Sequence, residues 1–438
     1  MKKRDNEDVS KSKFNHDVKR GNGQAYLILL NAKDRENYKN ELLNACLSCD
    51  TLNAQDEPGR ADYLYRMIRL YPDPSYFEAK IIEKLNDPTM EFGLFDQLSD
   101  LLTSMAKEGS HKALDHMWVL YDILIDRMKN EKSSPKIESN LDHLAVGLDQ
   151  ILGFTAFEKI AQDYVDINMM LDLHDFDMSY FFFMTSEKYG KSTTQAYTDQ
   201  FKPINEVDNI HNQQRPRPEK AKMTLQDIIE QNDKLNHYQI RKYLETVTTK
   251  ELDDLFELIK KDLDFNRRFR LLSFFSFTDH PIDIELVISW LKDQKDPFPD
   301  RVYWVLLKRP CLAVYDYAKS QLSDRKLANT ALILMCASFN HQEKDELIQR
   351  IKHIKNKFFL HDLFSWALME LFERDTKAPE ELMWYYLHES ICSHCRFSLV
   401  KIMGKRKLLS RDNLVELTFD CNQNTIDYAK SLLEAYPE

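Results

Sequence analysis

Histidine and cysteine residues near the C-terminal end of the sequence have types and spacing that could bind zinc. His388, Cys392 and Cys395 share one short segment, and Cys421 lies 26 residues further on. Structural zinc takes thiolate sulfur and imidazole nitrogen at tetrahedral distances. The usual second C-x2-C pair is missing, since the other such pair lies more than 300 residues away. Because unpaired cysteine is often buried, the alternative is that these cysteines line or cap a helix, and we expect no cofactor.

A second candidate site lies in the N-terminal part, where Gln55, Glu57, Arg60 and Tyr63 follow at short intervals. A carboxylate and a guanidinium three residues apart at the start of a helix can bind a polar ligand or a partner. Arg20 could lie close to this set in the fold. The same spacing fits an ion pair that stabilises the helix start and does nothing else. We predict a ligand- or partner-binding site at these five residues and leave the structural alternative open.

The sequence contains none of the motifs that commonly mark an active site. The nucleophile elbow G-x-S-x-G, the zinc-protease motif H-E-x-x-H and the protein-kinase motifs are missing. Gly21-Asn22-Gly23 could offer backbone N–H groups to a phosphate, but no strand precedes it and no third glycine follows. A Ser/His/Asp triad built from distant residues would leave no such motif. We assign no catalytic residue and expect a protein without catalytic activity of its own.

Glycine is scarce, and this scarcity argues against several enzyme folds. The chain has nine glycines among 438 residues, whereas about 7% is usual. Nucleotide-binding folds and β-hairpins need glycine in their turns. Rossmann, P-loop and hairpin-rich architectures are therefore disfavoured. Hydrophobic residues make up 43% of the chain, which is enough for a globular core.

Apolar residues recur at helical spacing along most of the chain, and alternating strand patterns are almost absent. Leu64, Met67, Ile68 and Tyr71 fall at i, i+3, i+4 and i+7, which predicts one buried stripe on a helix. Proline and glycine steps separate such segments. The pattern predicts an all-α protein, with N-terminal helices over 34–48, 60–71, 74–86, 91–108, 110–130, 137–152, 154–168 and 176–189.

Changes of composition divide the chain into four parts. Residues 1–13 are highly charged, which predicts a disordered N-terminus. Helical spacing over 14–190 predicts an N-terminal helical lobe. Residues 191–222 are polar, include Arg215-Pro216-Arg217-Pro218 and lose the helical period, which predicts a linker or a long loop. Helical spacing resumes over 223–438, which predicts a C-terminal repeat lobe.

A short internal repeat indicates how the helices are arranged. The segment 316–320 reads Asp-Tyr-Ala-Lys-Ser and recurs at 427–431, and a leucine follows each copy. The copies lie 111 residues apart, which fits three units of about 37 residues, near the HEAT and armadillo period of about 40. We therefore predict an α-solenoid of stacked antiparallel helix pairs, HEAT-like, in two lobes.

Net charge, cysteine usage and hydropathy indicate the location of the protein and its class of partner. Residues 1–190 carry 23 Lys+Arg and 33 Asp+Glu, which is nearly all of the net charge of −11. This acidic half argues against nucleic acid and favours a protein partner with a basic surface. The seven cysteines follow no signal-peptide pattern, and no apolar run reaches the roughly 18 residues of a membrane helix. We expect reduced thiols, a cytoplasmic location and no membrane.

Four short stretches, in this order along most of the chain, form a recognisable series. They are Arg20-Gly21-Asn22-Gly23-Gln24-Ala25, Gln55-Asp56-Glu57-Pro58-Gly59-Arg60 followed by Tyr63-Leu64-Tyr65, Lys308 to Leu322, and Ser390-Ile391-Cys392-Ser393-His394-Cys395-Arg396. The series resembles a family of HEAT-repeat-containing bacterial proteins, common in Gram-positive organisms and without an assigned activity. The resemblance implies a solenoid and supplies no reaction. Gln24 stands where that family would have a basic residue, so an anion-binding role there would not carry over.

The predicted architecture favours binding over catalysis. Stacked helix pairs present a long concave face that suits extended partners, so we predict a protein-interaction scaffold or adaptor. The alternative is a nucleic-acid-acting enzyme or binder resembling HEAT-like DNA glycosylases, which bind DNA on a basic concave face. Such a face could use Arg267, Arg268 and Arg270, which alternate with phenylalanines. The near-neutral charge of residues 191–438, with 37 Lys+Arg and 38 Asp+Glu, counts against it.

Overall fold

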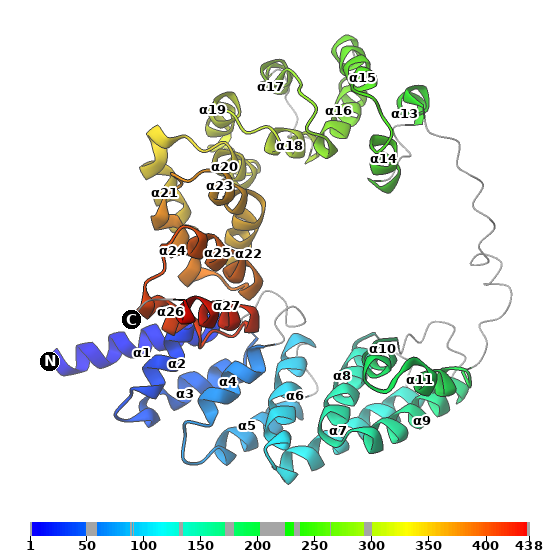
Figure 1. The fold of residues 1–438 in the computed structure, drawn as a ribbon, viewed down its shortest axis with the longest axis vertical. Coiled ribbons are helices and arrows are strands. Elements are labelled where there is room, and N and C mark those ends of the chain that lie inside the picture. Colours follow the sequence, from blue (N-terminus) through cyan, green and yellow to red (C-terminus); the bar gives the residue numbers. More distant parts are fainter. Residues whose placement is uncertain are drawn as a thin grey trace. The chain divides into compact units, whose positions relative to one another are not determined.

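The computed structural model is built from helices, and its contacts divide the chain into two compact units (Figure 1). Unit 1 comprises residues 1–213 and 387–438, and unit 2 comprises residues 214–386. Throughout the described residues every regular element is a helix, which confirms the predicted all-α class. The structure describes residues 2–49, 59–87, 90, 92–130, 135–170, 179–201, 224–231, 237–262, 264–292 and 300–435.

Unit 1 contains helices from both ends of the chain. The sequence pattern predicts that 387–438 belongs to a C-terminal lobe with 223–386, whereas the contacts place this segment with the N-terminal helices. The helices of unit 1 are α1 (Lys2–Arg20), α2 (Gly23–Leu30), η1 (Arg35–Tyr38), α3 (Lys39–Cys46), α4 (Arg60–Ile68), α5 (Ser75–Leu85), α6 (Phe92–Lys107), α7 (His111–Asn130), α8 (Pro135–Leu152), α9 (Phe154–Met170), α10 (Ser179–Tyr189), α11 (Lys191–Thr198), α25 (Ser393–Lys405), α26 (Arg411–Leu417) and α27 (Gln423–Glu434).

Unit 2 contains shorter helices, and α24 (Glu380–Glu389) spans the boundary between the units in the sequence. The helices of unit 2 are α13 (Leu225–Gln231), α14 (His237–Leu244), α15 (Thr249–Lys261), α16 (Phe265–Leu272), η3 (Ser273–Phe277), α17 (Ile284–Lys292), α18 (Asp300–Leu307), α19 (Leu312–Gln321), α20 (Ala328–Ala337), η4 (His341–Glu343), α21 (Lys344–Lys352), α22 (Lys357–Leu363), η5 (Phe364–Leu368) and α23 (Met369–Arg374).

Most of the helices predicted for the N-terminal part agree with the structure. Helices α4 to α10 begin and end within three residues of the segments predicted from 60–71 to 176–189. The predicted stripe of Leu64, Met67, Ile68 and Tyr71 is buried. Two segments differ, because α1 covers most of the predicted disordered N-terminus and α11 lies inside the predicted linker. Residues 202–222 of that linker lie outside the described residues.

Helix α15 shows how local sequence specifies these elements. Thr248 accepts a hydrogen bond from the backbone N–H of Glu251, and the Glu251 side chain accepts one from the Thr248 backbone N–H. This capping box satisfies N–H groups that the first turn would otherwise leave unpaired. Leu252, Leu255 and Ile259 then recur at helical spacing and are buried. A polar cap and an apolar stripe thus fix both the start and the inner face of the helix.

The core of unit 2 centres on α20. All seven residues from Ala331 to Ala337 are buried, so this part of the helix is apolar on every side, as expected for a helical segment covered by neighbours. It contacts α18, α19, α22 and η5. The π-helical segment η5 follows directly on α22 in the chain. None of the described helices is both long and apolar enough to span a bilayer.

Candidate functional site

The sequence motifs from both ends of the chain meet inside unit 1, where α2 packs against α26 and the side chains of Arg20 in α1 and Arg66 in α4 reach Glu389 and Asp420. Figure 1 shows the N-terminal helices beside α26 and α27. The backbone N–H of Cys421 donates to the Gly21 carbonyl at 3.0 Å, and the rings of Tyr26 and Phe419 stack with centroids 4.6 Å apart. We call this region the terminal junction.

Three glycines allow the backbones of the terminal junction to approach. A Cβ on Gly21 would lie 2.3 Å from the Cys421 Sγ, and one on Gly23 would lie 1.9 Å from the Glu416 carbonyl oxygen. A Cβ on Gly59 would lie 2.1 Å from the Cys421 carbonyl oxygen. Gly21 also has a φ of +75°, which disfavours other residues. The Gly-Asn-Gly segment, weighed above as a phosphate cradle, therefore serves close packing.

A buried ion pair lies at the centre of the terminal junction. The Arg396 Nε lies 2.7 Å from the Asp420 Oδ2, and both side chains are 1% exposed. The Arg396 guanidinium also donates to the Ser390 carbonyl and to the Cys421 Sγ, and Asp420 accepts from the backbone N–H of Asn422. These hydrogen bonds matter because a buried charge pair stabilises a fold only when its remaining donors and acceptors are satisfied.

The charged groups around Arg20 form a second network at the same junction. Arg20 Nη2 lies 2.7 Å from the Glu389 Oε2, and the His16 Nε2 lies 3.0 Å from the Glu389 Oε1. Hydrogen bonds to Asp17 and Glu389 raise the pKa of His16 to about 9, and the bond from His16 lowers the pKa of Glu389. His16 is thus a cation near neutral pH, and Arg20 is engaged by its own chain.

Arg60 and Tyr63, two more of the residues predicted to bind a ligand or partner, lie at the terminal junction. Tyr63 donates its hydroxyl to the Asn22 carbonyl at 2.8 Å, and burial raises the pKa of this hydroxyl so that it stays a donor. Arg60 is 4% exposed and donates Nη1 to the Val18 carbonyl. Its Nε and Nη2 have no partner in the part of the chain that is described. Gln55 and Glu57 lie outside the described residues.

The four predicted zinc ligands have different surroundings. Cys392 caps α25, with its Sγ 3.4 Å from the backbone nitrogen of Cys395, while the Cys421 Sγ accepts from Arg396. Burial lowers the pKa of His388. Within the described ranges, no three of these four residues have donor atoms within 4.8 Å of one another. The structure gives the set no common coordination centre, and zinc stays a prediction.

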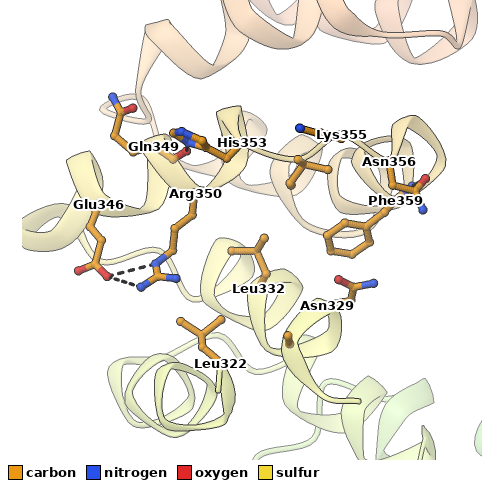
Figure 2. A pocket seen from close by; sticks show the side chains of 12 residues that line it. Leu322, Asn329, Leu332, Glu346, Gln349, Arg350, His353, Lys355, Asn356 and Phe359 are labelled. Carbon is orange, nitrogen blue, oxygen red and sulfur yellow. Dashed lines mark hydrogen bonds and ion pairs between the residues drawn. The ribbon is translucent and has the colours of Figure 1, made fainter. Parts of the chain in front are cut away.

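Unit 2 carries a different kind of site, an open groove of about 800 Å³ between α20, α21 and α22. Figure 2 shows Leu322, Leu332 and Phe359 turned toward its centre. Of these, Leu332 is buried, whereas Leu322 and Phe359 are partly buried and reachable from solvent. Together they form an apolar floor. We call this site the α20–α22 groove.

Polar and charged side chains surround the floor of the α20–α22 groove. Arg350 is held by Glu346 through two hydrogen bonds to Oε1, at 3.1 and 2.9 Å. Lys355 also lines the groove and has no ion pair within the described ranges. The side-chain amides of Asn329 and Gln349 likewise make no hydrogen bond to the described residues. The groove therefore offers free amides and one free ammonium beside an apolar surface.

No sequence motif marks the α20–α22 groove. Its lining comes from positions 322 to 359 on several elements, and each residue type is ordinary for a helix surface. One weak signal was present, since 350–357 holds Arg350, Lys352, His353, Lys355 and Lys357 without an acidic residue. The sequence does not show that this basic segment lies over the apolar side chains of α20.

Comparison with known proteins adds no family: no protein-family model matches the chain, and no curated protein matches it.

The buried ion pair predicts a large loss of stability when one partner is neutralised. Asp420→Asn would leave the Arg396 guanidinium buried without its counter-charge, and we expect the free energy of unfolding to fall by about 3–5 kcal/mol. Urea denaturation followed by circular dichroism measures this. Glu83→Gln, which removes the exposed Lys80–Glu83 pair, is the control and should leave the midpoint unchanged. Equal midpoints for both variants would contradict the role assigned to Asp420.

The close approach at Gly21 can be separated from its backbone conformation. Gly153 has a φ of +66°, close to the +75° of Gly21, but a Cβ there would meet nothing nearer than 3.9 Å. Gly153→Ala should cost about 1 kcal/mol from backbone strain, whereas Gly21→Ala must also displace Cys421. We expect Gly21→Ala to lower the melting temperature by at least twice as much. Similar losses for both variants would mean that the contact is unimportant.

The pKa of His16 predicts a pH dependence of stability. Because the folded protein holds this proton up to about pH 9 and the unfolded chain up to about 6.5, the contribution is complete below pH 6.5. It is then lost as the pH rises through 9. The difference in unfolding free energy between wild type and His16→Gln should therefore shrink from pH 6.5 to 9.5. Parallel curves over this interval would show that His16 is not held as a cation.

Proposed function

We propose that the protein is an α-solenoid of HEAT-like helix pairs that acts as a protein-interaction scaffold, with the α20–α22 groove as one of its binding surfaces. The observation that carries the proposal is hydrogen-bonding capacity left unused beside an apolar floor. Exposed apolar surface rimmed by polar groups commonly marks an interaction site, and unpaired amides can engage a partner at little cost.

The repeat architecture is supported by the burial of the two repeated segments. In α19 and in α27, the aspartate of the Asp-Tyr-Ala-Lys-Ser segment is exposed. The alanine is fully buried in both copies, as Ala318 and Ala429. Consecutive helices also contact one another, as in α6 with α7, α19 with α20, and α26 with α27. Such neighbour-to-neighbour packing is what a solenoid requires.

The chemistry of the groove favours binding over catalysis. Its lining contains no serine, threonine, cysteine or tyrosine that could act as a hydroxyl or thiol nucleophile. Its one carboxylate, Glu346, is engaged by Arg350, so it is poorly placed to act as a general base. The other groups are amides, cations, apolar surface and the His353 imidazole, whose Nδ1 lies 2.6 Å from the Gln349 carbonyl oxygen. These groups favour recognition of a partner over reaction with it.

A site-specific photo-crosslinker tests the scaffold function. We expect benzoylphenylalanine in place of Phe359 to capture a defined protein from a nuclease-treated lysate of the native host. Benzoylphenylalanine in place of Leu258, an exposed residue on α15, is the matched control and should capture none. Absence of any protein adduct at position 359, together with salt-dependent retention on DNA, would overturn the proposal in favour of a nucleic-acid binder.

A further inference from the structure

We infer that the α20–α22 groove binds an extended peptide segment in which an acidic side chain lies close to a bulky apolar one. The inference rests on the proposed scaffold function and names the class of partner. Three features of the groove lead to it: how open it is, which hydrogen-bonding groups it leaves unused, and the sign of its charge.

The openness of the groove fits a segment of a longer chain better than a small molecule. Seven of its twelve lining residues are exposed, and Leu332 is the one that is buried. Small-molecule sites usually enclose 70–90% of the surface of their ligand. A groove whose lining is this exposed does not enclose a ligand to that extent. A peptide segment can leave one side in solvent, because the rest of its own chain continues beyond the groove.

The unused amides fit the main chain of an extended peptide. Asn329 on α20 and Gln349 on α21 come from different helices that both border the groove. Each amide offers a carbonyl acceptor and an NH₂ donor, the complement of one peptide unit. An extended segment exposes such a unit every 3.3 Å or so. In a helical ligand these groups would already be paired within the ligand, so the amides favour an extended one.

The apolar floor of the groove accounts for the bulky apolar side chain of the inferred ligand. Leu322, Leu332 and Phe359 turn toward the centre of the groove (Figure 2). A leucine or aromatic side chain of the ligand would remove this surface from water, which is the main favourable term in such contacts. Because Lys355 lines the same groove as this floor, the apolar and acidic positions must lie close together in the ligand.

The charge of the groove selects an acidic ligand. Glu346 is the one acidic residue of the lining, and Arg350 neutralises it, which leaves Lys355 uncompensated. Unit 2 as a whole does not counteract the positive charge of Lys355, since residues 214–386 contain 28 Lys+Arg and 28 Asp+Glu. All of the net charge of −11 falls on the rest of the chain, and salt screens charges beyond a Debye length of about 8 Å.

Selection of random twelve-residue linear peptides on the full-length protein tests the inference. Wild type should enrich peptides with Asp or Glu within three positions of Leu, Phe or Trp. The Lys355→Glu variant should lose that enrichment. Lys326→Glu changes an exposed lysine outside the groove, and this matched control should keep it. Circular dichroism verifies that both variants fold.

Affinity measurements on the best enriched peptide complete the test. By fluorescence anisotropy, Lys355→Glu should weaken binding on the order of tenfold, since an attraction becomes a repulsion. Asn329→Ala should weaken it several-fold, and Lys326→Glu by less than about twofold. A peptide in which Lys replaces the acidic residue should lose affinity for wild type and regain it for Lys355→Glu.

Two outcomes would overturn the inference. Enriched peptides without an acidic residue, or binding that is insensitive to both Lys355→Glu and Asn329→Ala, would refute this class of partner. If Phe359 still captured a host protein, the scaffold function would stand. A preference of the groove for a labelled twelve-nucleotide single-stranded DNA over every peptide, with no protein captured at Phe359, would refute the inference and the scaffold function together.

Discussion

The buried pair of Arg396 and Asp420 is the interaction on which the terminal junction depends. Removing two charges from water is costly, and their attraction offsets that cost only when every remaining donor and acceptor is satisfied. The Ser390 carbonyl, the Cys421 thiol and the backbone of Asn422 supply those partners. All three lie within residues 390–422, and the Arg396 Nη2 also donates to the Gly21 carbonyl at 3.5 Å, where Gly21 lets the N-terminal backbone approach Cys421. The ion pair and this glycine contact together link the C-terminal segment to the N-terminal helices.

The terminal junction and the α20–α22 groove differ in how fully their polar groups are used. At the junction, Arg20 and Tyr63 each bind groups of their own chain, and Arg60, whose Nε and Nη2 have no partner among the described residues, is buried away from solvent. In the groove, the amides of Asn329 and Gln349 and the Lys355 ammonium lack partners within the described residues. The contrast explains why the residues with the most conspicuous motifs stabilise the fold. In the proposed function, ordinary surface residues supply the capacity to bind.

The two units also differ in charge, and this difference bears on partners. Unit 2 is neutral, and unit 1 carries the whole net charge of −11. A basic partner, as expected from the sequence, would be attracted to unit 1 by its long-range field. The proposed acidic peptide segment would bind the groove of unit 2 through short-range contacts. Both can hold for one scaffold, since a long-range field governs encounter whereas local contacts select the ligand.

The sequence by itself determined the helical class and most helix limits of the N-terminal part, because apolar spacing and capping residues act within a few residues of one another. Leu64, Met67 and Ile68 are buried as their spacing predicts. The sequence also indicated Arg20, Arg60, Tyr63 and Cys421 as candidate site residues. It did not show that they lie close together in the fold. Tertiary structure alone decided that the C-terminal segment joins the N-terminal helices, because that pairing depends on contacts across more than 350 residues, such as Gly21 with Cys421. It also decided where the groove lies. A groove exists only between helices, and no periodicity within one helix encodes it.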